Sequence, residues 1–259
     1  MKVAVITFSP EGLKVMQQIA AGMEVDQYLH QAIAAPEGVV AFERVYELTE
    51  KIFADYRGLV FIAPCGVVVR AIAPLLEHKL QDPAVVCLDV GARHAISLLS
   101  GHEGGANRLA IEIGNLTGAE PVISTTTEAV KDLIVGVGCR KGKSATEIRA
   151  AIEAALAVAG ATVEQVRYLA SADVKREEAG LLQAADELDI PLRIIGSELI
   201  RTAELGCEPS EFVQEQVNLP GVCEPAALLS GRRTSLILKK TAYNGITIAI
   251  ARENCTSLA

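Results

Sequence analysis

Short apolar runs alternate along the chain with segments whose apolar residues recur every three or four positions. The run KVAVITF at 2–8 is followed by a predicted helix that begins at Pro10. Strands are then predicted at 58–63, 84–89 and 94–99, and helices over 45–56 and 66–76. Strands that are apolar throughout and alternate with helices are typical of a parallel sheet covered on both faces.

The chain turns polar at STTTEAVKD (124–132), and a second series of elements begins there. Strands are predicted at 133–139, 166–171 and 191–195, and helices over 144–160, 174–188, 209–217 and 224–229. Two closing strands, 235–240 and 245–251, are joined by a turn at Tyr243-Asn244-Gly245. We therefore expect two α/β domains, 1–130 and 131–259, each with a mainly parallel sheet flanked by helices, and a ligand cleft between them.

Composition limits the class of protein. Half of the 259 residues are apolar, and no uninterrupted apolar run reaches ~18 residues, so we expect a soluble, cytoplasmic protein. Residues 1–130 hold 9 basic and 15 acidic side chains (−6), and residues 131–259 hold 15 and 17 (−2). Neither half has the basic excess of a protein that binds nucleic acid or an anionic membrane.

The six cysteines are far apart, and none forms a C-x-x-C pair. This spacing disfavours a disulfide framework and a structural zinc site, and most of these cysteines are predicted to be small buried apolar residues. Cys65 and Cys139 are exceptions, because each lies beside a glycine at a predicted strand end.

Residues 98–107, LLSGHEGGAN, place three glycines within five positions: Gly101, Gly104 and Gly105. A helix is predicted to begin near Gly104, so SGHEGG is a loop between a strand and a helix. In open α/β sheets ligands bind at the carboxyl ends of strands, where free N–H groups of a helix start meet an anionic or carbonyl oxygen. Glycines would allow that oxygen to come close.

Three polar side chains of this segment are candidates for chemistry. The positive end of the following helix favours a neutral His102, which could take a proton from water or merely bond a neighbouring loop. Glu103 is either solvated or part of the site. Asn107 could point its amide at the loop or cap it.

PCGVVVRAIAP at 64–74 repeats this arrangement, with Gly66 in the turn and Arg70 in the first turn of the predicted helix. Arginine there opposes the helix dipole, so Arg70 is predicted either to bind a substrate carboxylate or to pair with a nearby acid.

GVGCRKGKSATE at 136–147 joins a strand to a helix that opens with a Ser144 and Glu147 capping box. Its glycine spacing is one residue longer than the dinucleotide fingerprint, and Val137 stands where a P-loop needs glycine. A loop that receives an anion fits better, with Arg140, Lys141 and Lys143 around it. Lys175 and Glu178 are predicted on the first turn of the next helix, either solvated or in contact with substrate.

Together these stretches resemble the cobalt-precorrin-5A hydrolase family (CbiG) of anaerobic cobalamin biosynthesis. The resemblance rests on GLVFIAPCGVVVRAIAP, on VVCLDVGARHAIS with LLSGHEGGAN and EPVIST, on VGVGCRKG, and on SADVKREEAGLLQAADELDIPL. It covers roughly 58–128 and 133–195 well. Family members carry a middle segment between the halves, which is missing here, and the C-terminal half also resembles a stand-alone protein of the aerobic route.

The resemblance implies hydrolysis of a δ-lactone on a cobalt-corrinoid ring and loss of its C20 unit as acetaldehyde, giving cobalt-precorrin-5B. It implies His102 as base, with the Asn107 amide and the N–H groups of Gly104 to Ala106 as oxyanion donors. The implied substrate-binding residues are Cys65, Gly66, Arg70, Ser100, Gly101, Glu103, Gly104, Gly105, Gly138, Cys139, Arg140 and Lys175.

No cofactor of the protein's own is implied, because the substrate carries the cobalt. A corrinoid carrier without catalytic activity and a nucleotide-binding regulator are the alternatives. The residues leave open a homodimer and hand-over of product to neighbouring pathway enzymes, and they indicate neither a nucleic-acid nor a membrane partner.

Overall fold

The computed structural model describes residues 2–207, 214 and 218–255. The chain forms two compact units, Met1–Thr125 and Thr126–Ala259, and each is described by itself. The predicted boundary at 130 lies directly after helix α5 (Thr126–Ala129), five residues beyond this division. No helix among these described residues has the length and apolar character needed to cross a bilayer.

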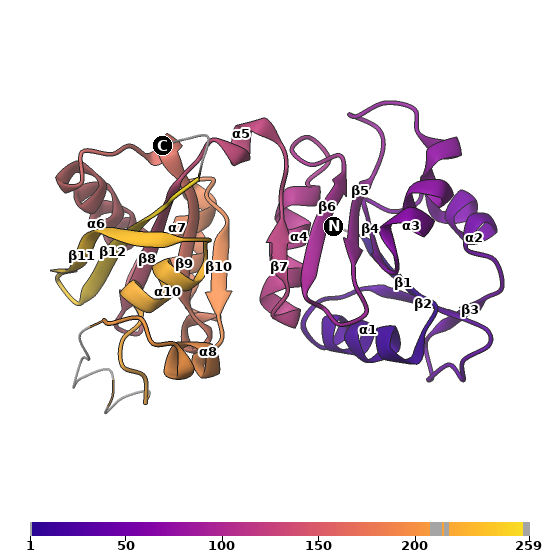
Figure 1. Ribbon diagram of the computed structural model, residues 1–259, viewed down its shortest axis with the longest axis horizontal. Helices are drawn as coiled ribbons and strands as arrows, with labels where there is room; N and C mark the ends of the chain where they lie inside the picture. The colour runs from indigo at the N-terminus through magenta and orange to yellow at the C-terminus, as the bar shows by residue number, and fades with distance from the viewer. Residues whose placement is uncertain (1, 208–213, 215–217, 256–259) are drawn as a thin grey trace. The chain divides into compact units, whose positions relative to one another are not determined.

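The first unit contains a seven-stranded sheet in the order β3-β2-β1-β4-β5-β6-β7 (Figure 1). Its strands are β1 (Val3–Thr7), β2 (Asp26–His30), β3 (Val40–Phe42), β4 (Gly58–Ile62), β5 (Ala84–Leu88), β6 (His94–Leu99) and β7 (Glu120–Val122). Neighbouring strands are parallel except for β5 and β6, which are antiparallel. The mainly parallel sheet is thus confirmed, with one reversal.

A short connection causes this reversal. Only residues 89–93 join β5 to β6, whereas a parallel crossover needs a dozen residues or more. The Asp89 carboxylate stabilises the turn, accepting hydrogen bonds from the backbone N–H groups of Gly91, Arg93 and His94, each at 2.9 Å. These bonds hold the pKa of Asp89 below its ordinary value although burial raises it.

Helices cover both faces of this sheet. Helices α1 (Pro10–Gly22) and α4 (Ala106–Thr117) pack on one face, against Val5, Val60 and Val86. Helices α2 (Val45–Ile52) and α3 (Cys65–Ile72), the latter continued by the 3-10 helix η1 (Ala73–Leu75), pack on the other. Because residues of one strand alternate between the two faces, both faces of β1, β4 and β5 are apolar and buried.

The second unit contains a five-stranded sheet in the order β10-β9-β8-β12-β11. Its strands are β8 (Leu133–Cys139), β9 (Val166–Ala172), β10 (Leu192–Ile195), β11 (Thr234–Tyr243) and β12 (Ile246–Glu253). Strands β8, β9 and β10 are parallel, and the closing hairpin of β11 and β12 joins them antiparallel. Asn244 and Gly245 have positive φ in the hairpin turn, as the sequence predicts.

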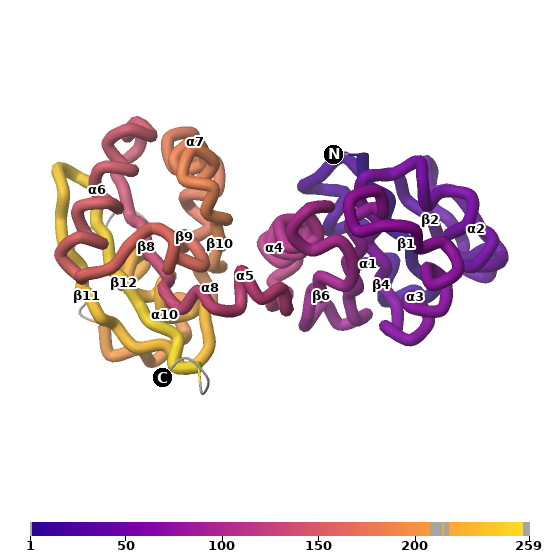
Figure 2. The backbone as a smooth tube through the Cα atoms, turned by 90° about the horizontal axis from the view of Figure 1, so that it is seen from above, coloured from indigo at the N-terminus to yellow at the C-terminus, as the bar shows by residue number. Residues whose placement is uncertain are grey.

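Helices α6 (Ala145–Val158) and α7 (Ala179–Glu187) lie side by side on one face of this sheet (Figure 2). Helix α10 (Cys223–Leu229) packs on β8, β9 and β12 from the other face, with α8 (Ser197–Thr202) beside it. Within the described residues this unit also contains α5 (Thr126–Ala129) and the 3-10 helices η2 (Val163–Gln165) and η3 (Asp173–Lys175).

Two predicted helices of this unit differ from the structure or lie outside it. The helix expected over 174–188 is divided into η3 and α7, so the prediction of one continuous helix is wrong. The helix expected near 209–217 lies almost wholly outside the described residues.

Candidate functional site

The sheet of the first unit separates its candidate residues into two groups. Residues 63–66 follow the carboxyl end of β4, which is parallel to β5. Residues 100–105 follow β6, which is antiparallel to β5 and ends beside Val85 near the start of that strand. The loop of residues 100–105 therefore lies at the amino end of β4 and β5, at the opposite end of the sheet from Cys65. Each loop therefore follows the carboxyl end of its own strand, as expected, but the reversal of β6 means that the two loops do not share one end of the sheet.

Backbone hydrogen bonds fix the loop of residues 100–105 to the start of α4. The Ser100 carbonyl accepts from the Ala106 N–H at 3.1 Å, and the Gly101 carbonyl accepts from the Asn107 N–H at 2.9 Å. Helix α4 consequently begins at Ala106, two residues later than predicted. Within the described part of the chain, the Gly104 and Gly105 N–H groups make no hydrogen bond. Three backbone N–H groups are predicted to donate to an oxyanion. That of Ala106 already donates to Ser100, whereas those of Gly104 and Gly105 have no acceptor among the described residues.

Each glycine of the loop has a structural reason of its own. A Cβ on Gly101 would lie 2.6 Å from Cγ2 of Thr125, and one on Gly104 would lie 2.4 Å from Cβ of Ser100. Gly105 is the N-cap of α4 at φ 88°, in the left-handed region that favours glycine. Close packing and backbone conformation thus require the three glycines, whatever binds there.

Asn107 is buried, and its amide connects three segments. Its Oδ1 accepts from the Ser97 hydroxyl at 2.8 Å, and its Nδ2 donates to the Thr125 hydroxyl at 2.9 Å. Thr125 reaches this position because β7 is parallel to β6, so both strands end at the same side of the sheet. No local pattern in the sequence marks Ser97 and Thr125 as partners of Asn107, since they lie 10 and 18 residues from it.

His102 and Glu103 lie on the exposed side of the same loop. The His102 imidazole makes no hydrogen bond to the described residues, so it is accessible to water. Glu103 pairs with Lys79, whose Nζ lies 2.7 Å from Oε1, and this hydrogen bond lowers the pKa of the Glu103 carboxyl. Glu103 is therefore tied to residues 76–82 instead of being simply solvated.

At the other end of the sheet, Arg70 lies in the last turn of α3, because that helix begins at Cys65. The prediction of a first-turn arginine is wrong, and so is the inference that its charge opposes the helix dipole. Its Nη1 donates to the Gly66 carbonyl at 2.9 Å, so the guanidinium reaches back to the start of α3. Arg70 and Gly66 are thus adjacent, as a carboxylate site at this loop requires.

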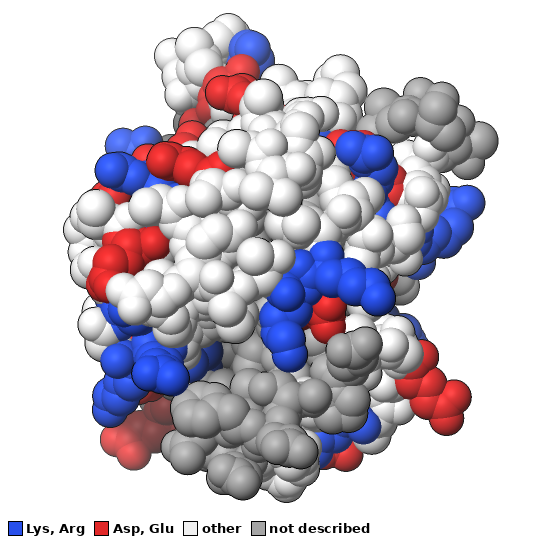
Figure 3. All heavy atoms as spheres, turned by 90° about the vertical axis from the view of Figure 1, so that its left-hand side faces the viewer, with Lys and Arg blue, Asp and Glu red and all other residues white. Residues whose placement is uncertain are grey.

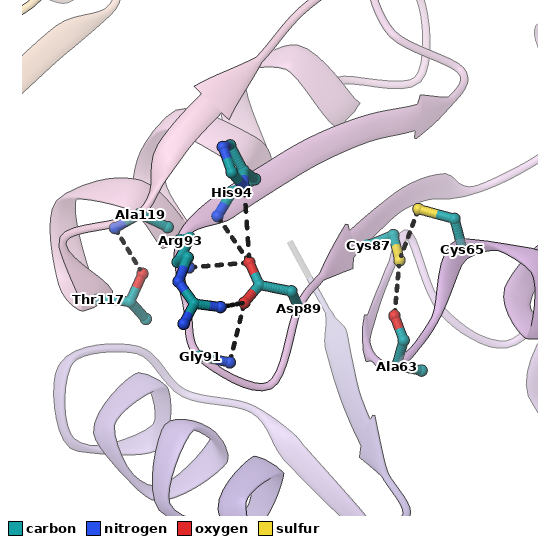
Figure 4. Close-up of polar contacts among 9 residues, drawn as sticks. All are labelled: Ala63, Cys65, Cys87, Asp89, Gly91, Arg93, His94, Thr117 and Ala119. Atoms are coloured by element: carbon teal, nitrogen blue, oxygen red, sulfur yellow. Dashed lines mark hydrogen bonds and ion pairs between the residues drawn. The ribbon is translucent and has the colours of Figure 1, made fainter.

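Cys65 faces Cys87 of β5 across the same end of the sheet (Figure 4). Their Sγ atoms are 3.4 Å apart, both thiols are free, and the Cys87 thiol donates to the Ala63 carbonyl at 3.1 Å. Burial raises the pKa of Cys87 well above its ordinary value. The Asp89 turn lies next to this pair in the same view.

In the second unit the candidate residues do come together. Gly138 and Cys139 end β8, and Arg140 follows it directly. Lys175 ends η3, which comes directly after the neighbouring strand β9. Lys175, Glu178 and Lys143 all act electrostatically on the Cys139 thiol, whose pKa burial raises. Neither Lys175 nor Glu178 is on a first helical turn, since Lys175 ends η3 and Glu178 is the N-cap of α7. The contact between them is nevertheless direct, with Nζ 3.2 Å from Oε2.

Charges of both signs are distributed over this unit. On the face shown in Figure 3, Lys and Arg side chains form separate groups with Asp or Glu nearby. Lys143 also pairs with an acid: its Nζ lies 2.7 Å from Oε1 of Glu147, which forms the predicted capping box with Ser144. Among the described residues, no three His, Cys, Asp or Glu side chains are placed to hold a metal ion.

Both units match known protein families. The first unit matches the family model described as "Cobalamin synthesis G N-terminal" over residues 47–128, and the second matches "Cobalamin synthesis G C-terminus" over residues 133–251. Only residues 129–132 separate the two matched stretches, so both motif-bearing halves follow each other almost directly.

Curated relatives agree with these matches. A cobalt-precorrin-5A hydrolase of Salmonella typhimurium is 37% identical over 127 residues, which are 49% of this chain and 36% of that protein. One of Priestia megaterium is 26% identical over 303 aligned positions, covering 79% of this chain and 80% of that protein. Protein CobE of Sinorhizobium sp is 35% identical over 128 residues, covering 49% of this chain and 83% of that protein.

The aligned lengths also show that this chain and its relatives differ in length. The match to the Priestia protein extends over more positions than this chain has residues, so that relative contains a stretch without counterpart here. This chain spans about a third of the length of the Salmonella protein. With one family model matched by each unit, and with a relative 35% identical over most of its length, the chain belongs to the cobalamin synthesis G (CbiG) family.

Proposed function

We propose that this protein is a cobalt-precorrin-5A hydrolase that opens the δ-lactone of the cobalt-corrinoid and releases the C20 unit as acetaldehyde. Its family membership and the curated relatives named for that activity support this proposal. The observation that carries it is the loop of residues 100–105, where an accessible imidazole and two backbone N–H groups without an acceptor occur within four residues. We place the protein in the cytoplasm, where such a biosynthetic step would occur.

In this proposal His102 removes a proton from water, and the resulting hydroxide oxygen attacks the lactone carbonyl. Negative charge then develops on the carbonyl oxygen, and the Gly104 and Gly105 N–H groups donate hydrogen bonds to it. Donors fixed in advance stabilise such an oxyanion more than water does, because they need not reorient. Asn107 holds the loop through Ser97 and Thr125, and the second N–H of its Nδ2 is the one left to donate to the oxyanion.

Lactone opening consumes one water and leaves a carboxylate and a free hydroxyl group. Cleavage of the adjacent carbon–carbon bond then converts that hydroxyl carbon into the aldehyde carbon of acetaldehyde. The electron pair of the broken bond passes into the conjugated macrocycle, which carries cobalt as part of the substrate. The carboxylic acid loses one proton, and the hydroxyl group loses another as its carbon becomes the aldehyde. The overall conversion is therefore cobalt-precorrin-5A and water to cobalt-precorrin-5B, acetaldehyde and two protons.

The carboxylates of the corrinoid need cationic partners, which the chain's net acidic charge does not supply. Arg140 and Lys175 of the second unit are the proposed partners. Arg70 lies at the opposite end of the first unit's sheet from residues 100–105, so it is proposed as a separate carboxylate site. Arg70 uses one N–H on Gly66, and a guanidinium has five such donors, so it can still bind a carboxylate in a planar fork.

A pair of histidine variants tests the proposed base. His102→Ala should reduce acetaldehyde release about 10²- to 10⁴-fold, the range of general-base catalysis, and leave corrinoid affinity close to that of the wild type. His78→Ala is the control, because His78 is also exposed and lies in the same unit. Wild-type acetaldehyde release by His102→Ala would eliminate the base assignment. Tight corrinoid binding without any aldehyde from the wild-type protein would instead identify a carrier.

A further inference from the structure

Glu178 occupies the N-cap position of α7, but its carboxylate makes no capping bond to that helix. Instead Oε1 accepts from the Gly142 N–H at 2.7 Å, in the loop that follows β8. Oε2 lies 3.2 Å from Nζ of Lys175, at the end of η3. One carboxylate therefore joins the loops that leave the neighbouring strands β8 and β9.

The contact is shielded from solvent. The Lys175 and Glu178 side chains are 16% and 10% exposed. Burial raises the pKa of Glu178, but the Gly142 N–H and the Lys175 ammonium outweigh it and leave that pKa below its ordinary value. Glu178 is consequently a carboxylate at neutral pH and carries both bonds as an ionised group.

Packing holds the same loop on two other sides. The Arg140 N–H donates to the Gly245 carbonyl in the β11–β12 turn at 3.0 Å. Gly180 packs on the backbone of Lys143, where a Cβ would lie 1.9 Å from the carbonyl oxygen. The start of α7 is therefore in direct contact with residues 142–144, and Glu178 adds the ionic link that extends this contact to Lys175.

We propose that Glu178 is a positioning residue that fixes the Lys175 ammonium and residues 140–142 as one preformed site for a carboxylate of the corrinoid. This inference rests on the proposed function, because it takes Arg140 and Lys175 as the groups that meet the substrate. Lys175 has a flexible four-carbon side chain, so without Glu178 its ammonium loses a fixed place. Ordering that side chain would then occur on binding and weaken affinity.

Two substitutions of Glu178 separate its two bonds. Glu178→Gln keeps an acceptor for the Gly142 N–H and loses the charge that holds Lys175, whereas Glu178→Ala loses both. We expect the KM for cobalt-precorrin-5A to rise about 3- to 10-fold in Glu178→Gln and further in Glu178→Ala, with kcat changed less than twofold. Glu177→Gln is the matched control, because Glu177 is exposed and adjacent. An unchanged KM in both Glu178 variants would overturn the inference. A fall in kcat as large as the rise in KM would also overturn it.

Two readouts make this test independent of the proposed activity. In ¹⁵N NMR spectra the Gly142 amide signal should shift as Glu178 is protonated in acid, and this shift should be absent from Glu178→Ala. The heptacarboxylate corrinoid cobyrinic acid should bind Glu178→Gln about 3- to 10-fold more weakly than wild type by calorimetry.

The outcomes distinguish the two claims. Wild-type protein that binds cobyrinic acid but releases no acetaldehyde contradicts the proposed function. The inference about Glu178 is then decided by the cobyrinic acid affinities of the wild type and the Glu178 variants. Equal affinity of wild type and both Glu178 variants, with the NMR shift present, assigns Glu178 a purely structural role and overturns the inference.

Discussion

Replacing Asn107 by alanine should destabilise the first unit, because the buried Asn107 amide connects β6, α4 and Thr125, three residues after β7. Asn107→Ala removes the Ser97 bond at 2.8 Å and the Thr125 bond at 2.9 Å together. The truncation also leaves both hydroxyl groups without this partner, in a segment where Gly101 packs directly on Thr125.

The magnitude follows from the two hydrogen bonds. Each contributes about 1 kcal/mol net, so their loss lowers the free energy of unfolding by about 2 kcal/mol. For a unit of this size, that loss corresponds to a melting temperature lower by about 5–10 °C. Thr125→Val removes only the acceptor of Nδ2 and should cost about half as much.

Differential scanning calorimetry measures the change, and hydrogen exchange read by mass spectrometry assigns it to the first unit through peptides of β6 and α4. The chain has no tryptophan, so these methods are preferable to intrinsic fluorescence. Full stability of Asn107→Ala together with lost acetaldehyde release would refute the structural role and restore Asn107 as an oxyanion donor.

Three further predictions concern single residues. Gly104→Ala should lower the melting temperature more than Gly142→Ala, because a Cβ on Gly104 clashes with Ser100. Gly142 has open space around it, so its substitution costs only the positive-φ strain of about 1 kcal/mol. Equal losses of stability in calorimetry would contradict this prediction. The Lys143 hydrogen bond lowers the pKa of Glu147 to about 2, so its stabilisation is complete above the ordinary value of 4.5 and is lost as pH falls toward 2. Melting temperatures of Glu147→Gln should lack that part of the pH dependence, and an unchanged acid profile would refute the assignment. Iodoacetamide at pH 8 should alkylate Cys65 before Cys87 and Cys223, because burial raises the pKa of Cys87 and raises that of Cys223 to about 11. The rates are measured by mass spectrometry of the labelled peptides, and equal rates for the three cysteines would contradict the prediction.

Strands with continuous apolar runs could be predicted from the sequence, and short or polar strands could not. β4 and β8 are buried on both faces, so their composition alone marks them. β2 is largely polar, and β3 and β7 have three residues each, so nothing in their composition separates them from loops. Their pairing to β1, β2 and β6 is a tertiary interaction that no local pattern encodes.

The antiparallel orientation of β6 can be predicted from the length of its connection to β5, although the alternation of apolar runs and helices suggests a parallel strand. Five residues cannot cross over to a parallel neighbour, so the length of the 89–93 connection already requires a hairpin. That single reversal decides which end of the sheet holds residues 100–105, and it separates them from Cys65 and Arg70. The contacts of Asn107 with Ser97 and Thr125, and that of Glu178 with Gly142, could not be derived in this way, because these partners are 10 to 36 residues away.

The turnover of acetaldehyde tests the central claim most directly. Purified protein is incubated with an excess of cobalt-precorrin-5A, the aldehyde is trapped as its hydrazone, and the corrinoid is followed by mass spectrometry. A hydrolase releases many equivalents of acetaldehyde per protein as cobalt-precorrin-5B accumulates, and His102→Ala releases almost none. Corrinoid that is bound and recovered unchanged, without aldehyde, would contradict the account.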